Sequence, residues 1–250
     1  MQDPEVYRRL IGKLLYLNLT RPDISYIVQQ LSQFLNAPRA PHYLAATYVL
    51  RYLKGTLNYG LFYAANVDLK LSTYCDADWG NCLDSGRSLT GYCIFLGSSL
   101  ISWKTKKHKA VSKSSTEAEY RSMSQTTSMS QTADEVVWID GLLEDLWIQV
   151  PKPITLFCDN VAAQHIADNP CFHERTKHLR RKHYKLDVHY VRENVQLGFI
   201  KIAHVSSALQ LADIMTKPLG ADQHRFLSQK IGLVSQPCVQ DWSGFSPSQS

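Results

Sequence analysis

Residues 1–63 show the pattern of amphipathic helices, with apolar side chains three and four positions apart. Three apolar stripes follow one another, interrupted at Pro22 and in the proline-containing segment 36–41, and the third is predicted to end at Gly55. The stripes are Tyr7, Leu10, Ile11, Leu14 and Leu15; Ile24, Ile27, Val28, Leu31 and Phe34; and Tyr43, Ala46, Val49, Leu50 and Leu53. No acidic pair lies among them, so we interpret this segment as support or nucleic-acid contact.

The pattern changes to strands near residue 60. Alternating or apolar runs predict strands over 60–63, 69–74, 89–96, 100–103, 154–158 and 199–202. Helices are predicted over 114–147, 161–168, 174–193, 209–216 and 224–231. We therefore predict an α/β domain over residues 64–233. The Ser-, Pro- and Gln-rich segment 234–250 is predicted to be a disordered tail.

Composition and charge narrow the functional classes. Of the 250 residues, 44% are hydrophobic and 20% charged, as in ordinary folded domains. The net charge of +5 comes from clustered basic residues, which favours a polyanionic partner. Six cysteines without a CxxC pair favour reduced thiols, and no apolar run reaches membrane-spanning length. The polar first residues predict no signal peptide, so we expect an intracellular protein, in a cytoplasmic particle or the nucleus, without a membrane partner.

Four acidic residues fall at positions that could meet in space. Asp76 and Asp159 follow predicted strands, and carboxylates at the ends of neighbouring strands emerge at the same edge of a sheet. Glu119 and Asp213 lie in predicted helices that could pack on that sheet. The alternative for segment 70–82 is a solvated junction between a strand and a turn.

Such a cluster of carboxylates requires cations, because the negative charges repel one another and raise one another's pKa values. Oxygen ligands without a set of His or Cys favour Mg²⁺ or Mn²⁺ over zinc. Two such ions about 4 Å apart suit hydrolysis of a phosphodiester. The residues by themselves therefore indicate metal-dependent phosphodiester hydrolysis.

Several motifs in fixed order resemble one family. YCDADW, SSTEAEY, FCDN and QLADIMTKPL resemble the ribonuclease H motifs of copia-type LTR retrotransposon Pol polyproteins, and RSLTGY, HERTKH and ISWKTKK are similar to further parts of that family. YRRLIGKLLYLNLTRPDISY and YVLRYLKGT resemble the end of the reverse transcriptase of the same polyprotein. The resemblance spans about residues 5–233.

This resemblance implies a fold, an activity and a ligand set. The fold is a ribonuclease H-like mixed five-stranded sheet with flanking helices, preceded over 1–63 by a small helical remnant of the reverse transcriptase thumb or connection. The activity is that of an endoribonuclease that hydrolyses the RNA strand of RNA–DNA hybrids with two Mg²⁺ ions, and the remainder of the Pol polyprotein is a partner. The implied metal ligands are Asp76, Glu119, Asp159 and Asp213.

Three finer assignments follow from the same resemblance. Glu117 and Glu119 are about 200° apart on a helix, so only one faces the metals, and the family pattern favours Glu119. Asp78 is assigned to the turn after Asp76. His204 matches a loop histidine near the scissile phosphate and would move protons or assist product release, although a strand-end histidine can equally be polar surface. The remaining histidines lack the partners of a zinc site.

Two basic segments are candidates for binding the substrate. Their lysines and arginines would contact phosphates without reading bases, whereas the alternative is a solvated charged loop. The candidate nucleic-acid-binding residues are Lys104, Lys106, Lys107, Lys109 and Lys113 in the first segment, and Arg175, Lys177, Arg180, Arg181 and Lys182 in the second.

The sequence departs from the family pattern at two near-repeats. Segment 123–128 (MSQTTS) is followed by 129–134 (MSQTAD), and 175–179 (RTKHL) by 180–184 (RRKHY). Six added residues rotate a helix by about 240° beyond whole turns, so we predict a break or kink between Met123 and Asp134. The near-repeats and the missing Tyr-x-Asp-Asp box make a catalytically impaired nucleic-acid-binding remnant the alternative function. An integrase or transposase, with Glu193 as the last acid, is a further alternative.

Overall fold

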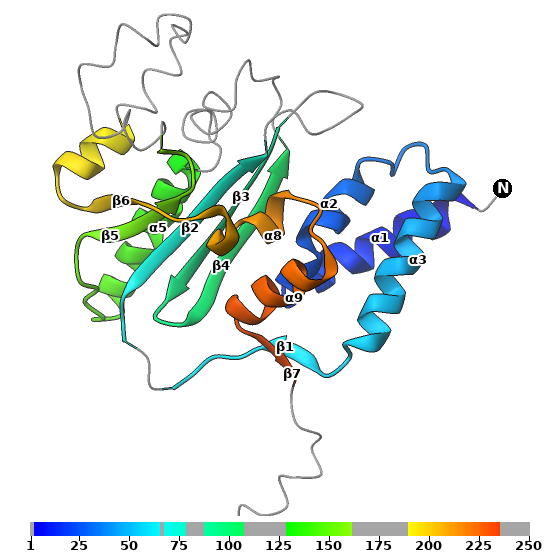
Figure 1. The fold of residues 1–250 in the computed structure, drawn as a ribbon, viewed down its shortest axis with the longest axis horizontal. Helices are drawn as coiled ribbons and strands as arrows, with labels where there is room; N and C mark the ends of the chain where they lie inside the picture. Colours follow the sequence, from blue (N-terminus) through cyan, green and yellow to red (C-terminus); the bar gives the residue numbers. More distant parts are fainter. Residues whose placement is uncertain (1–2, 66–67, 79–87, 108–128, 162–189, 236–250) are drawn as a thin grey trace, which may run out of the picture.

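The computed structural model describes residues 3–65, 68–78, 88–107, 129–161 and 190–235 (Figure 1). The chain begins with a helical segment of α1 (Pro4–Leu17), the 3-10 turn η1 (Pro22–Ile24), α2 (Ser25–Ser32) and α3 (Ala40–Gly55). The three apolar stripes therefore form helices, as predicted. Their buried residues form one core, which consists of Tyr7, Ile11, Leu14, Ile24, Val28, Leu31, Ala46, Val49 and Leu53.

A buried ion pair joins the start of α2 to the end of α3. Arg21 donates from Nε and Nη2 to the two carboxylate oxygens of Asp23, at 2.9 and 2.8 Å, and its guanidinium also donates to Thr56. The hydroxyl of Tyr52 donates to Asp23 at 2.6 Å. The buried charges are thus fully partnered, as charges removed from water must be.

The main sheet contains β2 (Leu71–Asp78), β3 (Leu89–Leu96), β4 (Ser99–Lys107), β5 (Ile154–Cys158) and β6 (Ile200–His204). Their order is β4-β3-β2-β5-β6; β2, β3 and β4 are antiparallel neighbours, whereas β5 runs parallel to both β2 and β6. The turn between β3 and β4 contains Gly97 at φ 60°, where glycine avoids strain. The predicted mixed five-stranded sheet with flanking helices is confirmed.

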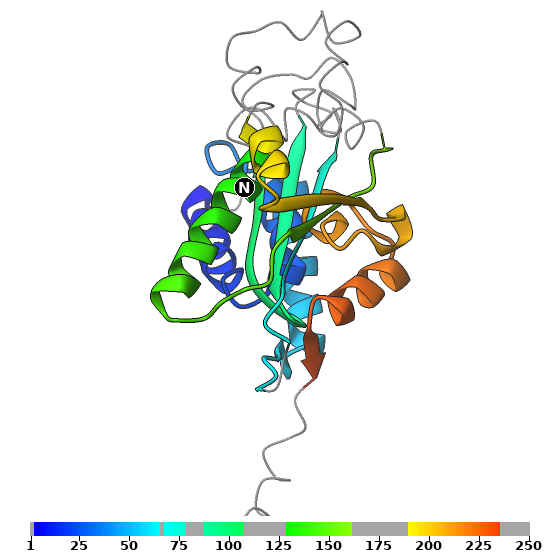
Figure 2. The ribbon, with the colours of Figure 1, turned by 90° about the vertical axis from the view of Figure 1, so that its left-hand side faces the viewer.

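Helices cover both faces of this sheet (Figures 1 and 2). On one face, α5 (Met129–Asp145) packs against alternate strand residues such as Cys75 and Ile94. The opposite face, with Cys93 and Phe95, packs against α8 (Asp213–Thr216) and α9 (Ala221–Lys230). The period of two along each strand therefore produces one core on either side of the sheet.

The helical segment packs directly on the α8 and α9 side of the domain. The indole of Trp103 on β4 donates to the carbonyl of Asn18 at 3.1 Å, and Nε2 of His224 on α9 lies 3.0 Å from the carbonyl oxygen of Asp23. A second, two-stranded antiparallel sheet pairs β1 (Tyr59–Leu61) with β7 (Leu233–Ser235). Within the described residues, no helix has both the length and the apolar character needed to cross a membrane.

Several predicted boundaries are wrong. Strand β4 continues to Lys107, so residues 104–107 are not in a basic loop, and β2 continues to Asp78, so that residue pairs with Leu89 instead of entering a turn. The predicted helix 209–216 is reduced to the four residues of α8, preceded by the 3-10 turn η3 (Ser207–Leu209). The predicted tail begins too early, because residues 234–235 belong to β7.

The remaining predictions for helices fall largely outside the described residues. Of the span 123–134, in which a break is predicted, residues 129–134 form the start of a continuous α5 and the rest is not described. Residues 162–189 are also outside the described part, whereas residues 190–196 are helical and pack on the sheet through Tyr190 and Val191.

Candidate metal centre

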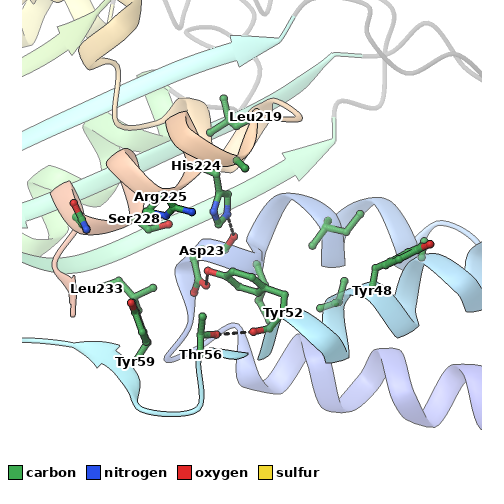
Figure 3. A pocket seen from close by; sticks show the side chains of 16 residues that line it. Asp23, Tyr48, Tyr52, Thr56, Tyr59, Leu219, His224, Arg225, Ser228 and Leu233 are labelled. Carbon is green, nitrogen blue, oxygen red and sulfur yellow. Dashed lines mark hydrogen bonds between the residues drawn. The ribbon is translucent and has the colours of Figure 1, made fainter. Parts of the chain in front are cut away.

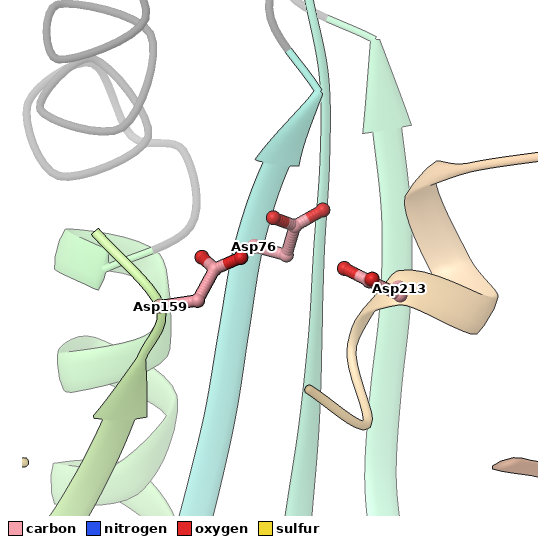
Figure 4. A group of neighbouring side chains, drawn as sticks. All are labelled: Asp76, Asp159 and Asp213. Atoms are coloured by element: carbon pink, nitrogen blue, oxygen red, sulfur yellow. The ribbon is translucent and has the colours of Figure 1, made fainter. Parts of the chain in front are cut away.

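Three aspartates from distant parts of the chain meet at one edge of the sheet. Asp76 lies on β2, Asp159 directly follows β5, and Asp213 is the first residue of α8 (Figure 4). One carboxylate oxygen from each residue lies within 4.8 Å of the other two. The sequence prediction that these three aspartates come together is therefore correct.

Strand register explains how the first two residues meet. Strands β2 and β5 are parallel neighbours with Tyr74 opposite Phe157, so Asp76 and Asp159 both follow two positions later at the same edge. Asp76 has the strand parity of Tyr74, which faces α8 and α9. The third aspartate reaches the cluster because α8 packs on that face.

A glycine and a glutamine hold α8 close to the sheet. Gly91 on β3 pairs with Asp76, and a Cβ atom at Gly91 would lie only 2.5 Å from Cβ of Met215 on α8. The buried side chain of Gln210 donates to the carbonyl of Cys75 at 3.0 Å and accepts from the N–H of Ala212 at 3.3 Å. The residues that start α8 are thereby anchored to β2 beside the cluster.

The cluster is deeply buried at two of its three members. Asp76 is 1% exposed and Asp213 is 6% exposed, whereas Asp159 is half-buried. Burial raises the pKa of Asp76, and the charge of Asp159 raises it further, against the lowering effects of Lys217 and Thr216. Burial, followed by the charge of Asp76, raises the pKa of Asp213 to about 7.

Side chains of the following turn contact the buried carboxylates. The hydroxyl of Thr216 donates to Oδ2 of Asp76. Nζ of Lys217 donates to Oδ1 of Asp213 at 2.7 Å and to Oδ1 of Asp76 at 3.2 Å. Burial lowers the pKa of Lys217, but Asp76 and Asp213 raise it by more, so this ammonium stays protonated. On the open side, the hydroxyl of Ser207 donates to Asp159 at 3.2 Å.

Sequence reasoning assigned no role to Thr216 or Lys217. Both lie in the motif QLADIMTKPL, and Lys217 follows Asp213 by four positions, the spacing of neighbours on one face of a helix. That spacing was a usable signal for the contact with Asp213. The contact with Asp76 carried no sequence signal, because 141 positions separate the two residues.

The structure gives less support to the other residues that the sequence predicts for the site. His204 is the last residue of β6, opposite Cys158, with an exposed side chain, and it is not a member of the carboxylate group. Glu117 and Glu119 lie outside the described residues. The assignment of the fourth acid therefore stays a prediction from the motif.

The described basic candidates all lie on β4, the strand at the far edge of the sheet from β6. Lys104 is exposed, whereas Lys106 and Lys107 are partly buried. Nζ of Lys107 donates to Oε1 of Gln33 at 2.6 Å, so this lysine contacts the helical segment. The candidates outside the described residues are Lys109, Lys113, Arg175, Lys177, Arg180, Arg181 and Lys182.

A cavity of about 710 Å³ lies elsewhere, between α3 and α9 (Figure 3). Its lining is mainly apolar and aromatic, with Tyr48 and Tyr52 from α3 and His224 from α9. The acid in its wall, Asp23, is already paired with Arg21. The carboxylate in the lining of this cavity is therefore not available to bind a cation. The candidate metal site is the aspartate cluster instead.

The donor set of that cluster fits a hard divalent cation. All three side chains offer carboxylate oxygens, the ligand type that Mg²⁺ and Mn²⁺ take in proteins. The ammonium of Lys217 already occupies a cation position between two of them. Asp76, Asp159 and Asp213 are therefore the described residues that could hold a metal.

No protein-family model matches the chain. It is 44% identical over 237 residues to the retrovirus-related Pol polyprotein from transposon RE2 of Arabidopsis thaliana, a match that covers 95% of this chain and 16% of that protein. The Pol polyprotein from transposon RE1 of the same plant is also 44% identical, over 95% of this chain and 15% of its own length. The polyprotein from transposon TNT 1-94 of Nicotiana tabacum is 32% identical over 92% of this chain and 16% of its own length.

Among solved structures, the chain is similar to the N-terminal RNase H domain of a Mycobacterium tuberculosis protein, solved as a fusion with maltose binding protein. The TM-score is 0.37 and the identity 14%, over 64% of this chain and 97% of that one. At this score, the description of the fold depends on the strand order and directions of this chain itself.

The mixed sheet with the order β4-β3-β2-β5-β6 and helices on both faces defines an α/β protein of ribonuclease H-like architecture. The sequence matches are more specific than the fold. The chain belongs to the retrovirus-related Pol polyproteins of copia-type transposons, and it spans about one-sixth of the length of the relatives named above.

Proposed function

We propose that this chain is a ribonuclease H, an endonuclease that hydrolyses the RNA strand of RNA–DNA hybrids with bound Mg²⁺. The observation that carries the proposal is the group of three aspartate carboxylates within 4.8 Å at the edge of the sheet. Its members come from the motifs YCDADW, FCDN and QLADIMTKPL, and membership of the Pol polyprotein family supports the same role.

Asp76, Asp159 and Asp213 would hold the metal ions, and Glu119 would add a fourth carboxylate. Two Mg²⁺ ions, or Mn²⁺ in their place, supply activation of the attacking water and stabilisation of the leaving oxygen when bound. The chain supplies fixed geometry, because ligands on a central strand and on a helix anchored to it keep their positions when the substrate binds.

The three aspartates differ in burial and in hydrogen bonding, and this difference suits separate roles in holding the metal ions and in admitting the substrate. Asp76 and Asp213 are buried and held by side chains of the chain itself, so they suit a permanent ligand role. Asp159 is half-buried, and among the described residues the hydroxyl of the exposed Ser207 donates to it, so the site opens toward solvent on its side. We expect the scissile phosphate to approach from that side.

The substrate and setting follow from the chemistry of the surface. A net charge of +5 favours the phosphates of a nucleic acid, and hybrid duplexes are bound through backbone shape and 2′-hydroxyl groups. Lys104 and Lys106 on β4 and the basic segment 175–182 are the proposed contacts. The setting would be reverse transcription inside the cell, in a cytoplasmic particle or the nucleus, with the rest of the Pol polyprotein as partner.

Cleavage of a labelled RNA–DNA hybrid, with Mg²⁺ and with EDTA, tests the proposal. We expect cleavage only with Mg²⁺, and little action on single-stranded RNA or duplex DNA. Asp76→Asn and Asp159→Asn should each lower the rate by several orders of magnitude, whereas Asp222→Asn, at an aspartate with a 99% exposed side chain, should not. Hybrid binding without cleavage would instead identify an impaired nucleic-acid-binding remnant.

A further inference from the structure

Lys217 is the only cation that the described residues place between two members of the aspartate cluster. Its Nζ lies 2.7 Å from Oδ1 of Asp213 and 3.2 Å from Oδ1 of Asp76, and its side chain is 30% exposed. The side chains of Asp76 and Asp213 are 2% and 8% exposed. Two nearly buried carboxylates thus share one partly exposed ammonium.

The contact with Lys217 reduces the electrostatic repulsion among the three carboxylates of the cluster. Three carboxylates within 4.8 Å repel one another strongly in a buried site. A single positive charge in contact with two of them offsets part of that repulsion. Lys217 therefore stabilises the arrangement of the acids without any metal.

The same contact conflicts with binding of a divalent ion. Mg²⁺ lies about 2.0–2.1 Å from its ligand oxygens, so an ion that bridges Oδ1 of Asp76 and Oδ1 of Asp213 would take the space in which Nζ now lies. The ion and the ammonium also repel each other as like charges. An ion that bridges the two oxygens therefore replaces the ammonium between them.

The position of Lys217 in the chain allows it to leave. It directly follows the last residue of α8, and the next residue is Pro218, so it lies at an exposed end of the element rather than inside it. Its flexible four-carbon stem can swing the ammonium into water without moving the aspartates. Asp213 and Thr216 stay anchored by the packing of α8 against Gly91.

We propose that Lys217 is a resident counter-ion of the aspartate cluster, which holds the carboxylates together in the metal-free protein and which a divalent cation must displace in order to bind. Lys217 thereby lowers the affinity of the site for its first metal ion and sets the metal concentration at which the site fills. This inference rests on the metal site of the proposed function and concerns the binding step alone.

Calorimetric Mg²⁺ titration of the full chain, with melting curves in EDTA, tests it. Lys217→Met removes the charge and keeps the length of the side chain. We expect a lower melting temperature in EDTA, because the acids lose their counter-ion. We expect Mg²⁺ to bind more tightly, by about 5- to 150-fold, the usual range for coupling between two ligands. Lys217→Arg, which keeps the charge, should leave the affinity near that of the wild type.

Lys152 provides a matched control. It pairs with the buried carboxylate of Asp140, and its side chain is 32% exposed, close to the value for Lys217. Lys152→Met should lower the melting temperature in EDTA but leave the Mg²⁺ affinity unchanged. Should Lys217→Met fail to fold, Lys217→Gln, which retains a donor for Asp213, gives the same comparison of affinities.

The outcomes separate this inference from the proposed function. Tighter binding in Lys217→Met supports the inference. If the wild type binds Mg²⁺ and Lys217→Met binds it equally well or more weakly, the inference is wrong, whereas the metal site of the proposed function still holds. If neither protein binds Mg²⁺ or Mn²⁺, the metal site and the inference fail together. None of these readouts depends on hydrolysis of a hybrid.

Discussion

Replacing Gly91 by alanine should disturb the aspartate cluster without touching any of its residues. Gly91 lies on β3 directly opposite Asp76, and α8 crosses the sheet above it. An added Cβ would lie 2.5 Å from Cβ of Met215 and 3.0 Å from Cγ2 of Thr216. Because the first contact involves a Cβ atom close to the backbone, α8 itself must move.

The size of the effect follows from these contacts. Adding a methyl group to a packed interior typically destabilises a protein by about 1–3 kcal/mol. For a protein of this size, about 2–4 °C of melting temperature corresponds to 1 kcal/mol, so we expect a fall of roughly 2–12 °C. The same shift would separate Thr216 and Asp213 from Asp76, so affinity for Mg²⁺ and cleavage of the hybrid should fall as well.

Thermal unfolding and Mg²⁺ titration of Gly91→Ala measure both effects. Gly141→Ala is the matched control, since Gly141 lies within α5 and an added Cβ there has no atom within 4 Å. That substitution should be neutral or stabilising by about 0.5–1 kcal/mol, because alanine favours a helix. An unchanged melting temperature and Mg²⁺ affinity in Gly91→Ala would refute the close packing of α8 on β3.

Three further predictions follow from the same region and from α5. Gln210→Leu removes two buried hydrogen bonds and should destabilise the protein by about 1–3 kcal/mol in denaturant unfolding, whereas Gln223→Leu, at an exposed hydrogen bond, should have little effect. Because the folded-state pKa of Asp213, about 7, lies above the ordinary 3.8, the folded protein holds a proton that the unfolded chain releases between these values. The melting temperature in EDTA should therefore fall as the pH rises from about 4 to about 7, and a slope equal to that of Asp213→Asn would contradict this assignment. Deleting Met129–Asp134, which leaves the near-copy 123–128 in its place, should raise the melting temperature or hybrid cleavage, and a fall in both would show that the second copy is part of the fold.

The apolar pattern predicted an element correctly where the residues of that element by themselves determine which side chains are buried. The stripe of Tyr7, Ile11 and Leu14 predicts a helix because its spacing matches the helical period, and those side chains are buried in the structure. Boundaries failed where pairing with another element decided them. From their sequence alone, residues 104–107 resemble a charged loop. In the structure they belong to β4, because their backbone groups pair with those of β3.

The candidate metal centre shows the same difference between what the local sequence predicts and what packing between elements decides. Asp76 and Asp159 could be predicted, since each follows a recognisable strand and parallel neighbours end at one edge. The role of Asp213 came from its motif rather than from its predicted helix, which is only four residues long. The placement of that short helix depends on Gly91 and Gln210, whose importance arises only from what packs against them.

By itself, the amino-acid sequence determined the helical segment, the α/β character of the remaining chain, three acids of the cluster and the family. These follow from local periodicity and from motifs of consecutive residues. Only the tertiary structure decided that Lys217 lies between Asp76 and Asp213. A contact between residues 141 positions apart depends on how strands and helices pack in space, and local spacing does not contain that information.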